Sequence, residues 1–327
     1  MKHSKNWIPE LVYAILLVFI LVFPFITKNL YLLHILILAG MWVILCVSLH
    51  LLEITGLFTL CIAAFMGIGA YASAILSMKL RWPFWAALPL AGVIAGSVAV
   101  LAGSIFLRVK GLMFAIITLA FGEVVVLAFS HWPGLGGKEG LTGLPVPNSI
   151  HLPLGLEIKF VGKIPYYFLT IGIVLISALI IYRIEKSRLG RVFSAIKAND
   201  TLTESIGVNV YGYRLLSFGI GSFFAGITGS LYGHYNTYIA PMEFGVWVSV
   251  MVFLLCVVGG MKSLLGPVIG AIFLTIVPEL LRGAKIYAPL FYAVLVLVVI
   301  FFLPDGLISL PDRIRALKRN YQKPETG

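Results

Sequence analysis

The amino-acid sequence predicts an all-α fold, a polytopic transmembrane helical bundle of about ten spans (8–10), some of them broken or re-entrant. Composition is the first support for this fold class. Hydrophobic residues make up 60% of the 327 residues, and the mean hydropathy is +1.04. Charged residues make up only 11%, against about 25% in a soluble domain. Such a chain cannot cover an aqueous surface with polar groups, so the lipid bilayer must be its main solvent.

The second support is a series of long apolar stretches, since a transmembrane helix needs about 20 mostly apolar residues. The ten stretches are 9–27, 31–52, 58–78, 84–107, 111–130, 165–183, 214–234, 244–260, 266–282 and 286–303. The first follows a basic N-terminus as in a signal peptide, but it lacks a small-residue cleavage site and is interpreted as a retained span. Gly67 and Gly69 in the third stretch, and Gly270 and Pro278 in the ninth, indicate broken or closely packed helices. Residues 1–327 are therefore predicted to form a single transmembrane domain.

The third support is the distribution of basic residues, which also orients the chain. Ten spans place both termini on one side of the membrane, and the 24 Lys and Arg residues divide 16 to 8 in favour of that side. Basic loops stay inside, so both termini are predicted to be cytoplasmic. Residues 131–164 then form an extracytoplasmic loop, and residues 184–213 form a cytoplasmic loop. The basic residues lie in short clusters between apolar runs, so the net charge of +11 does not indicate a nucleic-acid-binding protein.

The cytoplasmic loop is predicted to contain two short helices. The first follows Gly190 and carries an apolar stripe of Val192, Phe193 and Ile196. The second is predicted to start at Thr201, because Thr201 and Glu204 have the spacing of a capping box. Gly207 fits its end, because glycine adopts a positive φ without strain.

The apolar residues of this loop leave two interpretations open. A solvated connector does not need Val192, Phe193, Ile196, Leu202 and Ile206. These side chains require a partner, either the membrane domain itself or another protein. The chain has no recognisable P-loop, since Gly137-Lys138-Glu139 lacks both the Ser/Thr and the upstream glycine. If transport is driven by ATP, another subunit must hold the nucleotide.

Several stretches of the sequence resemble the permeases of branched-chain amino-acid ABC transporters, in their LivM-like branch. The matching stretches are Ser187–Asn209, Arg108–Glu123, Gly259–Ala271, Pro278–Leu281 and Leu303–Leu307. They follow the family's order from about residue 40 to 310. The sequence departs from the family at Leu202-Thr203, where members often carry two alanines.

The resemblance implies a permease subunit, in a bacterial cytoplasmic membrane, that imports Leu, Ile or Val and performs no bond chemistry. The implied partners are a second permease subunit forming a heterodimer, two cytoplasmic ABC ATPase subunits and an extracytoplasmic substrate-binding protein. No cofactor and no metal are expected. The residues implied to couple the permease to the ATPase are Arg188, Gly190, Arg191, Ala195, Ile196, Asn199, Thr201, Glu204 and Gly207. Related permeases carry urea, short amides or other amino acids, and these substrates stay open.

Four residues of the fifth stretch are candidates for the substrate path: Phe114, Thr118, Gly122 and Glu123. A carboxylate within a span is costly and is by default a functional candidate, so Glu123 could meet the ammonium group of a substrate. It could equally serve as a structural partner at a helix–helix contact. Thr118 could line the same path, although an intramembrane Thr usually bonds a carbonyl of its own helix.

Two other classes of protein are disfavoured by what the sequence lacks. A transporter driven by an ion gradient would normally carry several ionisable groups at mid-membrane, and Glu123 is essentially alone there. A membrane-embedded enzyme would need a nucleophile–base pair or a metal-ligand cluster, and neither spacing is present. Cys46, Cys61 and Cys256 all lie in apolar runs, which favours small buried hydrophobic residues over disulfides.

Overall fold

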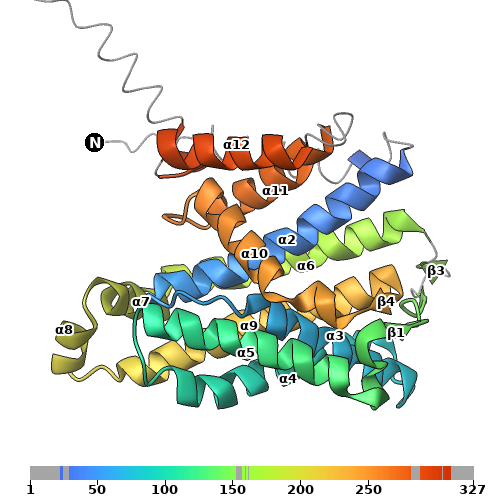
Figure 1. The fold of residues 1–327 in the computed structure, drawn as a ribbon, viewed down its shortest axis with the longest axis horizontal. Helices are drawn as coiled ribbons and strands as arrows, with labels where there is room; N and C mark the ends of the chain where they lie inside the picture. Colours follow the sequence, from blue (N-terminus) through green and yellow to red (C-terminus); the bar gives the residue numbers. More distant parts are fainter. Residues whose placement is uncertain are drawn as a thin grey trace, which may run out of the picture.

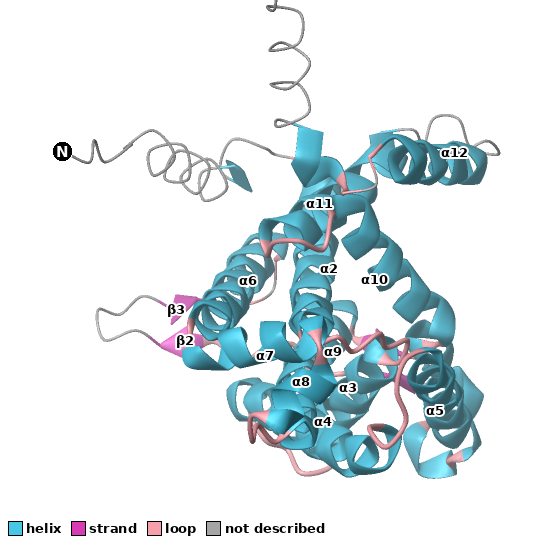
Figure 2. Cartoon of the chain, turned by 90° about the vertical axis from the view of Figure 1, so that its left-hand side faces the viewer, coloured by secondary structure: helices cyan, strands magenta, loops and turns pink. Residues whose placement is uncertain are grey.

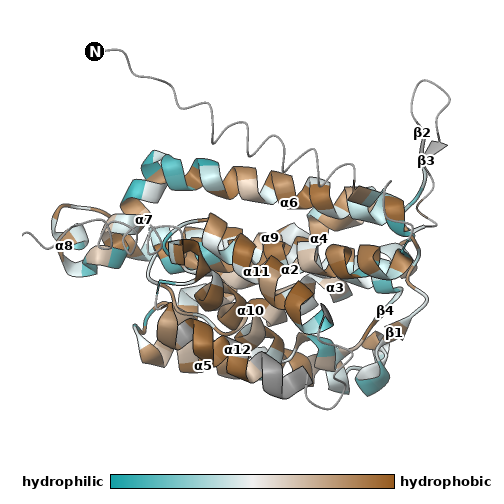
Figure 3. Cartoon of the chain, turned by 90° about the horizontal axis from the view of Figure 1, so that it is seen from above, coloured by the Kyte–Doolittle hydropathy of each residue, from teal (hydrophilic) through white to brown (hydrophobic). Residues whose placement is uncertain are grey.

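The computed structural model describes residues 23–24, 29–151, 157–158, 160, 162–280, 288–303 and 305–310. Its long helices are α2 (Leu30–Ile54), α3 (Ile62–Met78), α4 (Phe84–Phe106), α5 (Leu112–His131), α6 (Lys163–Lys186), α9 (Val210–Asn236), α10 (Val246–Gly259), α11 (Leu265–Leu280) and α12 (Ala288–Phe302). Two shorter helices, α7 (Arg188–Ala198) and α8 (Asp200–Ser205), lie between α6 and α9. Figure 1 shows α7 and α8 at one end of the bundle and the short strands at the other. Figure 3 shows hydrophobic residues along the helices and hydrophilic residues gathered at these two ends.

The predicted fold class is confirmed, because the described chain is an all-α bundle with several membrane-spanning helices. Within the described residues, six helical stretches are long and apolar enough to cross a membrane, and α3 and α11 are shorter apolar helices. Nine of the ten predicted spans coincide with helices, from α2 to α6 and from α9 to α12. The first predicted span, 9–27, lies almost entirely outside the described residues.

Helices α2 to α5 and helices α9 to α12 have the same pattern of packing in opposite orientations. Helices α3 and α4 pack on α9, and helices α10 and α11 pack on α2. Helices α2 and α9 are antiparallel: the first turns of α2 meet the end of α9 where His34 Nδ1 lies 2.6 Å from the Tyr235 hydroxyl. At the opposite end, the Thr55 hydroxyl lies 3.0 Å from that of Ser217. Figure 2, which looks along the bundle from the α7–α8 end, shows α2 and α9 near its centre.

The glycines inside the predicted spans serve close packing, because helices α3 and α11 run unbroken through them. A Cβ atom at Gly69 would overlap the backbone of Gly226 in α9, and one at Gly229 would overlap the carbonyl of Met66 in α3. The backbones of α3 and α9 therefore touch directly, as small residues allow in membrane helix pairs.

The true breaks lie between helices, in the extended segment 55–61 and in segment 237–245, which contains a short strand and a 3₁₀ turn. The backbone N–H of Leu60 donates to the Thr118 hydroxyl at 3.2 Å, and that of Ala63 donates to the Ser249 hydroxyl at 3.0 Å. Side chains of α5 and α10 thus satisfy backbone donors at the start of α3. Non-helical backbone at membrane depth requires such internal partners.

Two stretches far apart in the sequence meet at the α10–α11 turn. A Cβ atom at Gly306 would overlap Gly260, and a Cβ atom at Gly259 would overlap Gly266. The Lys262 ammonium group pairs with the Asp305 carboxylate at 2.5 Å. The stretches 259–271 and 303–307, which both carry the family resemblance, therefore form one packed unit.

Turns and short elements make up the described part of the loop 131–164 up to the start of α6. It contains the 3₁₀ turns η1 (Pro133–Leu135) and η2 (Gly137–Glu139) and the strands β1 (Leu141–Thr142), β2 (Ile150–His151) and β3 (Glu157–Ile158). β2 pairs with β3, and β1 pairs antiparallel with β4 (Tyr238–Ile239), with Leu141 opposite Ile239. The remaining described elements are the 3₁₀ turns η3 (Pro241–Phe244) and η5 (Leu307–Ser309).

All three cysteines of the chain are free and fully buried. The Cys46 thiol faces the Val252 carbonyl at 3.8 Å, and the Cys256 thiol faces the Cys46 carbonyl at 3.5 Å. These thiols pack as small apolar groups between α2 and α10.

Candidate functional site

The segment 184–213 forms a helical platform across the ends of the bundle (Figure 2). Helix α6 ends at Lys186, and the Ser187 hydroxyl caps α7 by accepting from the Leu189 N–H at 3.1 Å. Helices α7 and α8 are separated by Asn199 alone. The prediction of two short helices in this loop agrees with the structure.

The cap of the second helix was predicted two residues too late. Asn199, not Thr201, is the N-cap of α8, and its side-chain oxygen accepts from the Leu202 N–H at 3.0 Å. Its backbone carbonyl accepts from the Thr203 hydroxyl at 2.7 Å. Asn is as good an N-cap as Ser or Thr and lies first in the chain, so it sets the boundary. Gly207 ends the helix as predicted, with φ +84° and its N–H donating to the Glu204 carbonyl at 2.9 Å.

The apolar residues of the platform divide into two groups. Phe193 and Ile196 of α7 are fully buried, and the Phe193 ring meets the Tyr213 ring edge-on at the start of α9. Leu202 and Ile206 point away from the bundle and are 64% and 73% exposed. The membrane domain therefore covers the apolar side of α7, and it leaves the apolar residues of α8 without cover.

Gly190 has a packing role at the corner between α6 and α7. A Cβ atom at this position would overlap the backbone of Glu185. We expect Gly190→Ala to lower the free energy of unfolding by at least about 1 kcal/mol, because the corner must open. Thermal denaturation of the detergent-solubilised protein measures this effect, and an unchanged midpoint would contradict it. A bulky residue here would disturb the corner itself, so it is not a clean probe of docking.

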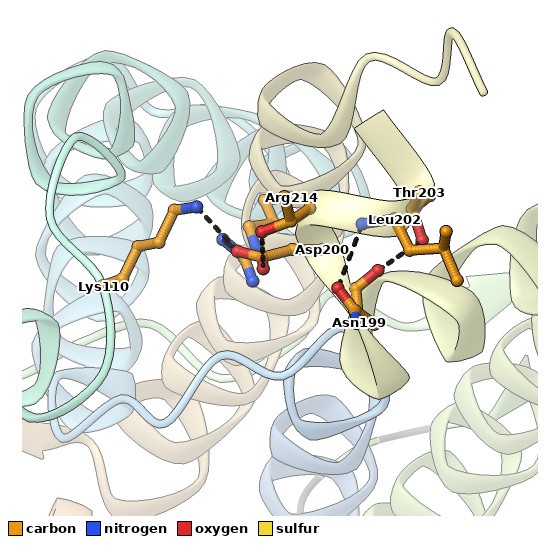
Figure 4. Close-up of polar contacts among 7 residues, drawn as sticks. Lys110, Asn199, Asp200, Leu202, Thr203 and Arg214 are labelled. Carbon is orange, nitrogen blue, oxygen red and sulfur yellow. Dashed lines mark hydrogen bonds and ion pairs between the residues drawn. The ribbon is translucent and has the colours of Figure 1, made fainter. Parts of the chain in front are cut away.

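Ion pairs fasten the platform to the membrane domain at separate points. Lys197 of α7 pairs with Glu53 of α2 at 2.5 Å, and the Glu185 carboxylate lies 3.8 Å from Nε2 of the buried His50. On α8, the Asp200 carboxylate receives two cations, as Figure 4 shows: Lys110 Nζ at 2.7 Å and Arg214 Nη1 at 3.5 Å.

These contacts join Asp200 to two membrane helices. Lys110 immediately precedes Gly111, the N-cap of α5, and Arg214 lies in the first turns of α9. The hydrogen bond from Lys110 holds the pKa of Asp200 below its ordinary value. The pair is therefore present at neutral pH and is lost only as the pH falls through that lowered pKa.

The other predicted coupling residues lie on this platform as follows. Arg188, Arg191, Ala195, Asn199, Thr201, Glu204 and Gly207 are exposed. Gly190 and Ile196 are buried against the chain itself. Seven of the nine predicted residues are thus exposed on the platform, and the other two are buried in its packing.

The four predicted path residues lie on different faces of α5. Phe114, Thr118 and Gly122 are buried against the bundle, and the Thr118 hydroxyl also donates to the Ala115 carbonyl at 2.9 Å. Glu123 lies on the opposite, exposed face and forms no ion pair with another described residue. The exposed apolar residues on that face are Met113, Ile116, Val124 and Leu127.

Sequence reasoning missed two acidic residues. Asp200 carries no local signal, because its partner Lys110 lies far away in the sequence and no short spacing links them. Glu243 falls one residue before the predicted span 244–260, yet it is half-buried and lines a cavity of about 190 Å³ with Tyr232, Trp42 and Met66. Glu123 is therefore not the only acidic side chain among the helices. Within the described residues, no group of three or more His, Cys, Asp or Glu could hold a metal ion.

Comparison with known proteins identifies the family of the chain. The family model described as the branched-chain amino acid transport system permease component matches residues 31–303. No solved structure shows a significant match.

Curated relatives agree with this match. The high-affinity branched-chain amino acid transport system permease protein LivM of Escherichia coli K12 is 29% identical over 290 residues, covering 83% of this chain and 68% of the relative. The probable branched-chain amino acid transport permease protein LivM of Methanocaldococcus jannaschii is 25% identical over 238 residues, covering 67% of each chain. The permease protein LivH of Escherichia coli K12 is 30% identical over 132 residues, covering 39% of this chain and 42% of the relative. The chain is a member of the family of permease components of branched-chain amino acid transport systems.

Proposed function

We propose that the chain is the permease subunit of an ABC importer for branched-chain amino acids and that the platform, residues 184–213, docks a separate ATPase subunit. The observation that carries the docking is the uncovered pair Leu202 and Ile206 on α8. A contact with another protein would remove the apolar surface of these two side chains from water, which is favourable. The ion pairs at Glu53 and Asp200 join the segment that carries these two side chains to the membrane domain.

The distribution of basic residues supports a cytoplasmic location for the platform. Arg188 and Arg191 are exposed on α7, and the cytoplasmic side of a membrane protein carries the excess of basic residues. With α7 and α8 in the cytoplasm, both termini are cytoplasmic and the loop 131–164 faces outward. A bacterial cytoplasmic membrane is the matching location, and a substrate-binding protein would approach the outer loops.

The exposed face of α5 is the proposed contact with a second permease subunit. A carboxylate such as Glu123 is costly against lipid, so this face requires a partner that offers a cation, a hydrogen-bond donor or water. The neighbouring Val124 and Leu127 are 60% and 54% exposed and supply apolar area for the contact. The substrate ammonium group could meet Glu123 at such a subunit boundary. The LivM and LivH relatives are both named as permeases of one kind of system, which supports a heterodimer.

The test of docking is the double substitution Leu202→Glu with Ile206→Glu in the complex co-expressed with its ATPase, second permease and binding protein. Two carboxylates cannot enter an apolar contact without a large desolvation cost. We expect at least about tenfold less ATPase to co-purify, because each 1.4 kcal/mol lost at the contact reduces binding tenfold. The control is Leu202→Met with Ile206→Val, which keeps the apolar pair and should retain the ATPase.

Full retention of the ATPase by the Glu variant would show that the platform is only a connector. Uptake of leucine by proteoliposomes of this chain alone, abolished by an ionophore, would instead indicate a transporter driven by an ion gradient.

A further inference from the structure

We propose that Asp200 is the positioning residue through which movement of the docked platform reaches helix α5. The proposal rests on the docking function proposed above and specifies how that surface acts on the membrane domain. Asp200 lies at the start of α8, between the exposed Leu202 and the bundle (Figure 4). Its carboxylate is the shared partner of Lys110 and Arg214.

Through Lys110, a movement of Asp200 would displace helix α5. Lys110 belongs to the short linker 107–111 between α4 and α5. Gly111, the next residue, has φ +63°, and a Cβ atom there would meet nothing within 4 Å. Gly111 is also the N-cap of α5, so this one residue separates Lys110 from the first turn of the helix. A displacement of the Lys110 backbone therefore acts directly on the start of α5.

Helices α4 and α5 are held to the bundle very differently. The end of α4 is tied to α9 by the Tyr211 hydroxyl, which donates to the Ser104 carbonyl at 3.1 Å, and its glycine face packs along α9. The buried shares of the two helices are similar, 33% for α5 and 39% for α4, but the closeness of their contacts differs. A Cβ atom at Gly122 of α5 would lie no closer than 3.6 Å to a neighbouring atom, so α5 lacks the tight glycine contacts that α4 makes with α9. Helix α5 also carries Glu123 on its exposed face.

The two cations that pair with Asp200 differ in how far their side chains are exposed to solvent. The Arg214 side chain is 13% exposed and is fixed in α9, whereas the Lys110 side chain is 59% exposed. An exposed ion pair contributes little to folding stability, so it can break and re-form during a transport cycle. Arg214 keeps α8 in register with the bundle while Lys110 moves. Loss of the Asp200–Lys110 pair should therefore affect coupling and leave the fold intact.

The experiment uses the assembled complex of permeases, ATPases and binding protein in lipid nanodiscs. The variants are Asp200→Asn, Lys110→Gln and the double variant, with Arg108→Gln as a matched control. Arg108 is an exposed cation in the same linker that pairs with no described carboxylate. Three quantities are measured: ATPase co-purification, stimulation of ATP hydrolysis by leucine-loaded binding protein, and hydrogen exchange at residues 108–114 with and without a non-hydrolysable ATP analogue.

We expect each single variant to retain the ATPase but to lose at least about fivefold of the stimulation, the lower range of coupling between linked sites. The double variant should lose no more than Asp200→Asn alone, because that change already breaks the pair with Lys110. The nucleotide-dependent exchange at 108–114 should disappear in these variants and persist in Arg108→Gln. Asp200→Glu, which keeps the carboxylate, should retain most of the stimulation.

Three results would overturn the proposal. Normal stimulation in Asp200→Asn would show that the ion pair is not used, and losses that multiply in the double variant would show that the residues act separately. Loss of ATPase co-purification in Asp200→Asn would make Asp200 a docking contact and not a joint. If the Leu202→Glu, Ile206→Glu variant keeps its ATPase, the docking proposal fails by itself, whatever the Asp200 variants show.

Discussion

Gly229→Leu is expected to prevent the permease from folding into a stable bundle. A side chain at Gly229 would overlap the Met66 carbonyl, so α3 and α9 would have to separate along their whole contact. On α3 near this contact, Ser73 bonds to both Ser230 and His234 of α9, and that network would be lost too. Overpacking usually costs about 1–3 kcal/mol. We expect more than about 3 kcal/mol here, because the overlapping atoms are backbone and cannot rotate away.

The matched control for this prediction is Gly172→Leu in α6, where an added side chain meets open space. It makes the same chemical change in another membrane helix, and it should leave the yield and the unfolding midpoint unchanged. Unfolding in SDS titrations of the purified protein measures both variants. Equal stability of the two would mean that the α3–α9 contact can relax, contrary to our expectation.

Thr118→Val combined with Ser249→Ala is expected to destabilise the start of α3. The two hydroxyls accept from the backbone N–H groups of Leu60 and Ala63, at 3.2 Å and 3.0 Å. Each buried donor left without a partner costs about 1–3 kcal/mol, so the double variant should lose about 2–6 kcal/mol. Water cannot replace the hydroxyls cheaply at this depth.

The control for this variant is Thr275→Val in α11. The Thr275 hydroxyl donates to the Ala271 carbonyl of its own helix, at 2.6 Å, and within the described part of the chain it bonds to no other element. We expect a change within about 0.5 kcal/mol in the same SDS titration. A comparable loss in the control would attribute the effect to the hydroxyls themselves and not to the extended segment 55–61.

The fold could be predicted to the level of its spans because lipid imposes a strong pattern on sequence. A helix that crosses the membrane must be apolar over its length, so stretches such as 84–107 are visible without any structure. The packing role of Gly69 and Gly229 could not be predicted from the sequence in the same way. A glycine that breaks a helix and one that permits a close crossing look identical until the facing helix is known.

The candidate site shows the same limit at the scale of single residues. Gly207 was predicted correctly because its requirement for a positive φ is local. The cap was misassigned because Asn199 and Thr201 are both suitable caps, and the choice depends on the helix that follows. The Asp200–Lys110 pair joins residues on separate elements, so only the packing of α8 beside the α4–α5 linker reveals it.

Because all three cysteines are buried, we expect the unmodified chain not to react with thiol-specific labels. Maleimides and spin-label reagents are electrophiles that react with exposed thiolates, and Cys46, Cys61 and Cys256 are each 0% exposed between packed helices. A cysteine introduced on the platform, for example at the exposed Ser205, would then be the one reactive thiol. A fluorescent reporter can therefore be attached there without replacing the native cysteines.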